Sequence, residues 1–259
     1  MHNTFKIELA AHGISDKGDL RSIDEDRILL KKYDIANEEW GMFLVADGMG
    51  AKGRGGEASQ IIIDVLSNWW ENELATILSM PFEPDLLFDS LDTAIAIANA
   101  GVLKIQAGEM MGSTLSLLFM MGQKYIIRHV GDSRVYLLNK MQGIRQLTKD
   151  HTYVASQMRA GLLTAAEAKV HPKRNVVTQV IGAKPELSMF CSAGECMADD
   201  MFLLCSDGFH NLVSEKTILD IAFNASDITE KVTSLRNSIE AGKAYDNVSI
   251  VLVHPARHN

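Results

Sequence analysis

Residues 41–50 read GMFLVADGMG, and residues 201–209 read MFLLCSDGF. In each stretch an apolar run of strand length is followed by an aspartate and a glycine, with the aspartates at Asp47 and Asp207. Short apolar runs that are bounded by turn residues are typical of buried β-strands. The two stretches therefore predict core strands that end in acidic side chains, and this feature decides how the rest of the chain is interpreted.

Eight strand-like runs are spread along the chain. Two pairs of them are separated only by short connections, at residues 122–123 and 131–134. Such connections join antiparallel neighbours, because parallel strands need a crossover of a dozen or more residues. We therefore expect antiparallel sheet, built from residues 5–11, 27–33, 42–46, 114–121, 125–130, 135–139, 201–205 and 248–254.

Apolar residues recur at helical spacing in three segments, at 58–69, 87–105 and 228–239. Each segment is apolar on one face only, so each is expected to cover a sheet. Because strands and helices come in separate blocks, the pattern favours an α+β fold in layers over a doubly wound parallel sheet. Residues 149–182 contain only short helical pieces, at 154–160 and 164–168, and we interpret this region as an insertion.

Composition limits the classes of protein that need to be considered. The chain has 259 residues, of which 47% are hydrophobic and 22% are charged. These values suit a single large domain over 1–259 and exclude global disorder. Lys and Arg number 25 against 33 Asp and Glu, the net charge is −8, and no block of basic residues is visible. We therefore expect no nucleic-acid partner.

The location of the protein is predicted from three features. Lys6 and Glu8 interrupt the start of the chain before an apolar run could reach the length of a signal peptide. The longest apolar stretch, 115–121, is far below the roughly 18 to 20 residues that a membrane helix needs. Three cysteines without paired spacing suit reduced thiols. We expect a cytoplasmic monomer with no membrane partner.

Two more aspartates lie beside apolar strands. Asp132 lies within YIIRHVGDSRVYLL, and Asp246 precedes the last strand in AYDNVSIVLV. A single aspartate of this kind is usually a turn residue that hydrogen-bonds its own backbone, and this alternative stands for each position alone. Four carboxylates that meet at one sheet edge would repel one another without a positive charge among them. Since no His/Cys set accompanies them, we expect a hard cation, Mg²⁺ or Mn²⁺.

A glycine-rich loop, GMGAKGRGG, follows at residues 48–56. It is not a phosphate loop of the Walker type, because that loop requires Gly-Lys-Ser/Thr and Gly53 is followed by arginine. We interpret Gly48 as a position where a backbone carbonyl can approach a metal held by Asp47. A flexible, solvated loop is the alternative.

Taken together, these residues match a known pattern. The sequence resembles the PP2C-type, metal-dependent protein serine/threonine phosphatases, and in particular their compact bacterial members. The resemblance extends over nearly the whole chain in eight ordered motifs: SDKGDLRSIDED (15–26), VADGMG (45–50), GSTLSLL (112–118), VGDSRVYLL (130–138), LTKDHT (147–152), HPKRNVVTQVIG (171–182), LLCSDGF (203–209) and DNVSIVLV (246–253).

The resemblance implies a four-layer α-β-β-α sandwich, with two antiparallel sheets between helix pairs and two Mn²⁺ or Mg²⁺ ions at one edge. By position, Asp47 would bridge both ions and the Gly48 carbonyl would bind one of them. Asp207 and Asp246 would ligate the other ion, and Asp26 would act through metal-bound water.

Two further positions match functional residues of the family. Asp132, together with Asp207, matches the pair that holds a third, weaker metal in bacterial relatives. Arg21 matches the arginine that binds the phosphate. The residues expected at the site are therefore Arg21, Asp26, Asp47, Gly48, Asp132, Asp207 and Asp246, of which Arg21, Asp47, Asp132 and Asp207 are the catalytic set.

The sequence departs from the family at two positions. Asp24 stands where the family often has asparagine, and Met49 stands where many eukaryotic members have a histidine that can act as general acid. Methionine cannot donate a proton, so the general acid is left open. Residues 149–182 correspond to the flap beside the active site, which varies in the family and is linked to substrate choice.

The expected reaction is hydrolysis of phosphoserine and phosphothreonine. Two divalent ions lower the pKa of a shared water and position a bridging hydroxide for in-line attack, so no phosphoenzyme is required. The alternatives are a phosphotransferase with an aspartate nucleophile, a non-catalytic phosphoprotein-binding relative, and an enzyme for a small phosphorylated metabolite. The expected partners are phosphorylated proteins, including a Ser/Thr kinase or the substrates of that kinase.

Overall fold

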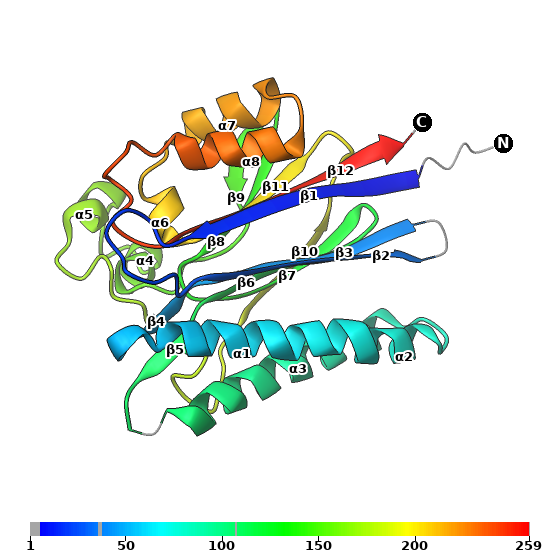
Figure 1. Ribbon diagram of the computed structural model, residues 1–259, viewed down its shortest axis with the longest axis horizontal. Coiled ribbons are helices and arrows are strands. Elements are labelled where there is room, and N and C mark those ends of the chain that lie inside the picture. Colours follow the sequence, from blue (N-terminus) through cyan, green and yellow to red (C-terminus); the bar gives the residue numbers. More distant parts are fainter. Residues whose placement is uncertain (1–5, 36–37, 107, 259) are drawn as a thin grey trace.

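The computed structural model describes residues 6–35, 38–106 and 108–258. Two antiparallel sheets of five strands each lie face to face between helices (Figure 1). The first sheet has the order β1-β12-β11-β8-β9, and the second has the order β10-β7-β6-β3-β2. Their bounds are β1 Lys6–Asp16, β12 Val248–His258, β11 Met201–Cys205, β8 Arg134–Asn139 and β9 Gly143–Gln146, then β10 Phe190–Glu195, β7 Lys124–Val130, β6 Leu115–Met121, β3 Glu38–Ala46 and β2 Arg27–Ile35.

Helices cover the outer face of each sheet. Figure 1 shows α1 and α3 beneath the second sheet, and α7 and α8 above the first. The predicted α+β class and the four-layer arrangement are therefore confirmed. The helices are α1 Gly55–Asn68, α2 Leu74–Leu78, α3 Pro84–Ile105, α6 Asp207–His210, α7 Glu215–Asn224 and α8 Ile228–Asn237, and a two-stranded ribbon pairs β4 Gly48–Gly50 with β5 Met111–Ser113.

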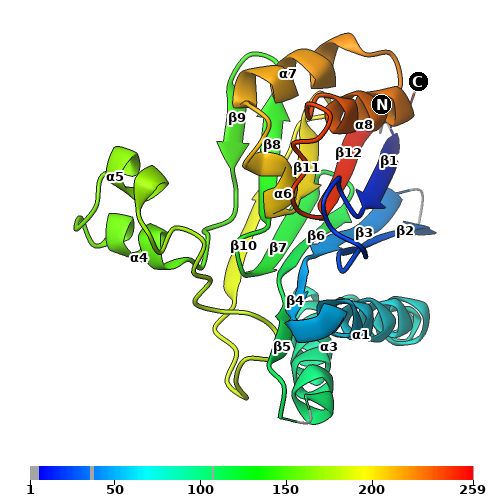
Figure 2. The ribbon, with the colours of Figure 1, turned by 60° about the vertical axis from the view of Figure 1, so that its left-hand side comes forward.

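The flap lies outside the four layers. It contains α4 Tyr153–Arg159 and α5 Ala165–Val170, which project from the sandwich (Figure 2). Both helices begin at a threonine whose hydroxyl accepts a backbone N–H: Thr152 from Ala155, and Thr164 from Glu167 in a reciprocal capping box. Caps of this kind are typically worth about 1 kcal/mol, so even these short helices have defined starts.

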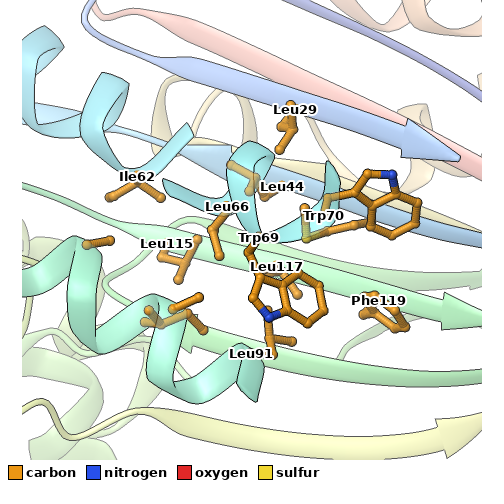
Figure 3. Packing of buried hydrophobic residues seen from close by; sticks show 14 of the residues in the cluster. Leu29, Leu44, Ile62, Leu66, Trp69, Trp70, Leu91, Leu115, Leu117 and Phe119 are labelled. Atoms are coloured by element: carbon orange, nitrogen blue, oxygen red, sulfur yellow. The ribbon is translucent and has the colours of Figure 1, made fainter. Parts of the chain in front are cut away.

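Apolar side chains fill three layers, one between the two sheets and one beneath each helix pair. In the layer beneath α1 and α3, Trp69, Trp70 and Phe119 pack with their rings edge-on or tilted (Figure 3). Leu66 is fully buried in the same layer. Truncating such a leucine to alanine typically costs about 2–5 kcal/mol, so this layer contributes strongly to stability.

Some elements were missed or bounded differently by the sequence pattern. The sequence pattern did not predict β9, β10 or α7. The two strands are short or half-exposed at sheet edges, and the apolar stripe of α7 covers only a few residues. The stripe over 58–69 runs on through a π-helical turn, Trp69–Glu73, into α2. The first strand was predicted to start at Phe5, which lies outside the described residues.

Within residues 6–35, 38–106 and 108–258, one helix is long and apolar enough to cross a membrane by length and composition. It is α3, whose best 18-residue window has a mean hydropathy of 1.4. In this fold α3 packs on α1, and its buried face includes Leu87, Leu91, Ile95 and Val102. Core helices of globular proteins share these properties, and the apolar face of α3 is used to cover the second sheet.

Candidate active site

The strand-end aspartates gather at one end of the sandwich. This is the end where α6, β4 and the flap lie in Figure 1. Asp47 follows β3, Asp132 lies in the turn from β7 to β8, and Asp207 is the first residue of α6 after β11. Two more precede strands, Asp26 before β2 and Asp246 shortly before β12. The site therefore takes carboxylates from both sheets.

These aspartates lie close enough together to perturb one another's ionisation. Burial raises the pKa of Asp47 well above its usual range, and repulsion from Asp26, Asp207, Asp132 and Asp246 raises it further. A group of like charges removed from water disfavours ionisation of each member. The predicted convergence of the acidic side chains is thus observed at the centre of the site.

Three neighbours of Asp47 are perturbed in the same direction. Burial is the largest cause at each, and it raises the pKa of Asp26 to about 7, of Asp132 to about 7 and of Asp207 to about 6. Repulsion from Asp207 adds to the effect at Asp132, and repulsion from Asp246 adds to it at Asp207. The protein therefore places acidic groups where their charged form is unfavourable unless a cation compensates it.

Asp26 provides a separate test of whether the site suits a metal. Its residue is 1% exposed, and both carboxylate oxygens lack a hydrogen-bond partner, although the hydroxyls of Ser206 and Ser249 lie close enough to lower its pKa in part. A buried carboxylate without partners is costly, and hard divalent cations prefer oxygen donors. Among the described residues, no three acidic, histidine or cysteine side chains are already drawn around one point. The donor set, which consists of carboxylate oxygens, fits Mg²⁺ or Mn²⁺.

Arg21 lies at the rim of the acidic cluster. It comes from the connection between β1 and β2, and its Nη2 donates a hydrogen bond to Asp246 Oδ2 at 2.9 Å. This bond, with the charges of Glu25 and Asp47, raises the pKa of the Arg21 guanidinium. Half of the Arg21 side chain is exposed, so the same fork can also face solvent. Arg21 is therefore a cation with access to the cluster.

The glycine-rich loop packs backbone against backbone. A Cβ on Gly48 would lie 2.3 Å from the carbonyl oxygen of Gly55 and 2.5 Å from that of Glu25. No side chain fits there, so glycine is required at this position for close packing at the start of α1. The two ends of the loop therefore pack against each other, whereas residues 50–52 between them are exposed.

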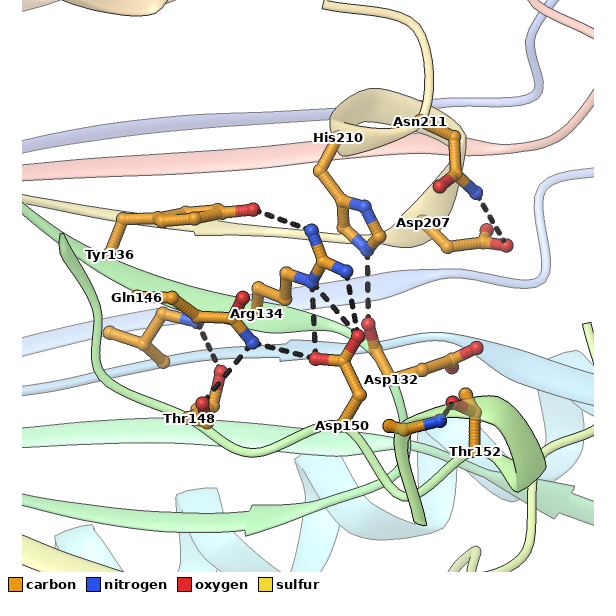
Figure 4. A network of polar contacts seen from close by, with 12 residues as sticks. Asp132, Arg134, Tyr136, Gln146, Thr148, Asp150, Thr152, Asp207, His210 and Asn211 are labelled. Atoms are coloured by element: carbon orange, nitrogen blue, oxygen red, sulfur yellow. Dashed lines mark hydrogen bonds and ion pairs between the residues drawn. The ribbon is translucent and has the colours of Figure 1, made fainter. Parts of the chain in front are cut away.

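A polar network supports the Asp132 turn (Figure 4). The Arg134 guanidinium donates to both oxygens of Asp150 at 2.7–3.1 Å. His210 lies within 3.0 Å of the Asp132 carbonyl oxygen through Nε2, and burial lowers the pKa of His210 to about 4, so the neutral ring donates this bond. The imidazole of His151 accepts from the Gly131 N–H at 3.1 Å. The turn is therefore held from three sides.

Asn247 was not singled out from the sequence, and Asp24 was noted only as a departure from the family pattern. Asn247 accepts from the Glu25 N–H at 2.9 Å, and its amide donates to the carbonyls of Lys17 and Ile23. It thereby fixes the connection that bears Arg21. Asp24 Oδ1 accepts from the Asp26 N–H at 3.0 Å. The only sequence signal for Asn247 was its position next to Asp246. Its role could not be predicted from this position, because its hydrogen-bond partners lie more than 220 residues away in the chain.

The fold and the site together define a class of protein, a layered α+β protein with an acidic centre at a sheet edge that suits a divalent cation. A model of the family described as Protein phosphatase 2C matches residues 22–241. The chain therefore belongs to the protein phosphatase 2C family, and it is a protein serine/threonine phosphatase. The resemblance noted from the motifs is confirmed.

Known relatives agree over most of the chain. The serine/threonine phosphatase stp of Listeria welshimeri is 30% identical over 214 residues, covering 81% of this chain and 82% of that protein. The serine/threonine protein phosphatase PstP of Mycobacterium tuberculosis is 32% identical over 92% of this chain, which corresponds to 43% of that longer protein.

Solved structures agree in the same way. The crystal structure of the Mycobacterium tuberculosis PstP phosphatase superposes with a TM-score of 0.82 at 30% identity, covering 97% of this chain and all of that one. The catalytic domain of PstP in complex with two manganese ions superposes with a TM-score of 0.80 at 28% identity, over 96% of this chain and 99% of that one.

Proposed function

We propose that this phosphatase hydrolyses phosphoserine and phosphothreonine in proteins with divalent metal ions held at the acidic edge. The observation that supports this most is the convergence of Asp26, Asp47, Asp132 and Asp207 on one another, with the unpartnered oxygens of Asp26 among them. An isolated turn aspartate would face solvent and its own backbone instead.

The residues that would hold two ions are Asp47 with the Gly48 carbonyl, Asp207 and Asp246, with Asp26 acting through water. Asp132 and Asp207 would share a third, weaker site. The ions are Mn²⁺ or Mg²⁺, in line with the oxygen-only donors and with the two manganese ions of the PstP catalytic domain. When bound, they supply a water of lowered pKa as the nucleophile for in-line attack.

The protein side chains bind and orient the phosphoryl group. Arg21 offers a planar fork that matches two phosphate oxygens, and its bond to Asp246, a proposed metal ligand, supports this role. Thr114 Oγ1 accepts the Asp47 N–H at 2.9 Å, which fixes the backbone at the centre of the site. If Asp132 and Asp207 hold a third ion, that ion would supply charge or an acidic water for the leaving oxygen, a role that Met49 cannot fill.

The alternatives have less support. A phosphotransferase with Asp47 as nucleophile normally needs a second aspartate two residues on, where Met49 stands. A non-catalytic phosphoprotein-binding relative would lack a metal carboxylate, and all of the expected ones are present. An enzyme for a small phosphorylated metabolite uses the same chemistry and is separated by its substrate profile.

The domain organisation, oligomeric state and location of the protein are also proposed. We infer a single domain over 1–259 with a flap at 149–182, acting as a cytoplasmic monomer on phosphorylated proteins that include a Ser/Thr kinase or its substrates. The three described cysteines are free, and burial raises the pKa of the Cys205 thiol, which suits a reducing compartment.

The deciding experiment measures phosphate release from phosphoserine and phosphothreonine peptides after chelation, with and without added Mn²⁺ or Mg²⁺. We expect no activity in the chelated protein and recovery with metal. Full turnover by rigorously metal-free protein would exclude the proposed mechanism. Turnover of a small phosphorylated metabolite with no turnover of peptides would favour the metabolite alternative.

A further inference from the structure

The flap is locally basic in an acidic protein. Residues 149–182 contain five Lys and Arg and two Asp and Glu, although the whole chain has a net charge of −8. Of the two acids, Asp150 is bound to Arg134, and Glu167 is bound within its capping box to Thr164. The basic side chains of the flap are therefore not neutralised from within it.

Five neighbouring residues form what we call the flap patch: Lys169, Val170, Lys173, Arg174 and Val176. All five are exposed, with Val170 at 80% and Val176 at 46%. In the described parts of the chain, none of the three cations lies within ion-pair distance of an acidic group. Unpaired cations beside exposed β-branched side chains form a surface suited to a ligand that is both acidic and apolar.

Hydrogen bonds give the flap patch a defined shape. The Val176 N–H donates to the Lys173 carbonyl at 3.2 Å, and the Val176 carbonyl accepts from the Tyr153 N–H at 2.8 Å. Lys173 Nζ lies 5.0 Å above the ring of Tyr153, which is stacked on His171. A surface with its backbone held in this way binds a ligand without first being ordered.

A short chain of bonds joins the flap patch to the active site. Just beyond Val176, Thr178 donates its N–H and its hydroxyl to the His151 carbonyl at 2.7 and 2.8 Å. The His151 N–H donates to the Gly131 carbonyl at 2.7 Å, and Gly131 precedes Asp132. The flap also lies at the same end of the sandwich as α6 and β4 (Figure 1), so the residues that flank the phosphorylated one are the part of a substrate nearest to the flap patch.

We propose that the flap patch binds an acidic segment with an apolar residue, located in the phosphoprotein substrate a few residues from the phosphorylated serine or threonine. This inference rests on the proposed function. A short acidic segment of a substrate needs contact with the flap patch alone and not with the acidic surface around it. A membrane surface or a nucleic acid presents an extended field of negative charge, which the acidic remainder of the chain repels.

The test compares two phosphothreonine peptides that differ only in the residues that flank the phosphothreonine. In the acidic peptide these residues are Asp, Glu and Leu, and in the neutral peptide they are Ser and Gln. We expect kcat/KM to be roughly fivefold higher or more for the acidic peptide at low ionic strength, with the difference shrinking at high salt. The double variant Lys169→Glu with Arg174→Glu should lose or reverse this preference. The matched control is Lys124→Glu with Lys140→Glu, two exposed lysines at hairpin turns on the far end of the sheets.

Turnover of an aryl phosphate with Mn²⁺ is measured in all three proteins to separate the two proposals. Equal aryl phosphate turnover with a peptide preference only in the wild type and the control supports the flap patch. Wild-type activity with no peptide preference overturns the inference and leaves the proposed function in place. No metal-dependent activity on any substrate overturns the proposed function itself. Sedimentation with phosphatidylserine vesicles that depends on Lys169 and Arg174, without a peptide preference, would assign the flap patch to a membrane and overturn the inference.

Discussion

Arg21 Nη2 donates a hydrogen bond to Asp246 Oδ2 at 2.9 Å, although 225 positions separate the two residues in the chain. The bond joins the connection after β1 to the segment before β12, and Asn247 reinforces the same junction. It places the only guanidinium assigned to phosphate binding against a proposed metal ligand. Several predictions about the reaction depend on this junction and on the aspartates behind it.

Replacement of Arg21 should impair phosphate binding in the transition state. We expect Arg21→Ala to lower kcat/KM by about 10- to 1000-fold, and Arg21→Lys to recover only part of it, because an ammonium cannot supply a planar fork. Steady-state kinetics on a phosphopeptide measure this. Arg145→Ala, at an exposed position on β9, is the control. Unchanged kinetics in both Arg21 variants would show that Arg21 is only a surface charge.

The metal ligands can be tested by isosteric changes. Asp47→Asn and Asp246→Asn should each weaken Mn²⁺ binding and behave like the chelated protein while remaining folded, because each amide keeps the size of the carboxylate and removes its charge. Calorimetric titration with Mn²⁺ and the circular dichroism spectrum check this. Asp64→Asn, on the exposed face of α1, should bind Mn²⁺ normally. Wild-type affinity in either site variant would mean that the ligand assignment is wrong.

Asp132 distinguishes a metal role from a turn role. A turn aspartate would cost roughly 0.5–2 kcal/mol of stability when replaced by alanine. Burial and Asp207 instead raise the pKa of Asp132 to about 7, so we expect Asp132→Ala to leave the metal-free melting temperature unchanged or higher. Turnover should fall by about one to three orders of magnitude, more for phosphoserine than for an aryl phosphate, because serine needs a proton to leave.

The Asp132→Ala prediction is read from thermal unfolding and from kinetics on both substrates. A lower melting temperature with normal turnover would return Asp132 to the role of a turn residue. Equal losses on phosphoserine and on the aryl phosphate would argue against proton donation near the leaving oxygen.

The metal-free protein should lose stability as pH rises. The pKa of Asp26 is about 7 in the fold, against about 3.9 in an unfolded chain. Between these values the folded state binds more protons, so this group's contribution to stability is fully present below pH 4 and is lost on passing through pH 7. We expect chelated protein to melt at a higher temperature at pH 5 than at pH 7.5, and Mn²⁺ to restore stability at pH 7.5.

The variant Asp26→Asn isolates that contribution, because it removes the ionisable group while keeping its size. The difference in melting temperature between pH 5 and pH 7.5 should shrink in this variant relative to the wild type. The same pH dependence in both proteins would show that Asp26 is not a source of the destabilisation.

The pair formed by Arg134 and Asp150 should stabilise the turn that bears Asp132. Arg134→Ala leaves Asp150 with little compensation, so we expect a loss of about 3 kcal/mol in the free energy of unfolding. The double change Arg134→Met with Asp150→Leu should recover much of it, because an apolar pair needs no charge compensation. Denaturant titration measures both proteins. A double variant no more stable than Arg134→Ala would contradict this account.

Much of the fold was predictable because its signals are local. Apolar runs ending in aspartate identified β3 and β11, and the short connection at residues 122–123 correctly predicted the antiparallel pairing of β6 with β7. The same prediction for residues 131–134 was wrong: β7 and β8 belong to different sheets, and β8 pairs with β11 and β9, because this turn carries the chain from one sheet to the other. β10 was missed because it lies at a sheet edge, where alternate side chains face solvent and no apolar run forms. Its place beside β7 is set by backbone pairing with a strand some sixty residues earlier in the chain.

The sequence by itself determined the residue types of the site, since carboxylates at strand ends and the order of the motifs can be read without coordinates. Only the tertiary structure decided which of them meet. Repulsion among Asp26, Asp47 and Asp207, and the bond from Arg21 to Asp246, arise when two sheets bring distant strand ends to one edge. The physical reason is the range of the interactions. The tendency of a segment to form a strand depends on residues close by in the chain, whereas the ionisation and metal affinity of a carboxylate depend on groups close by in space.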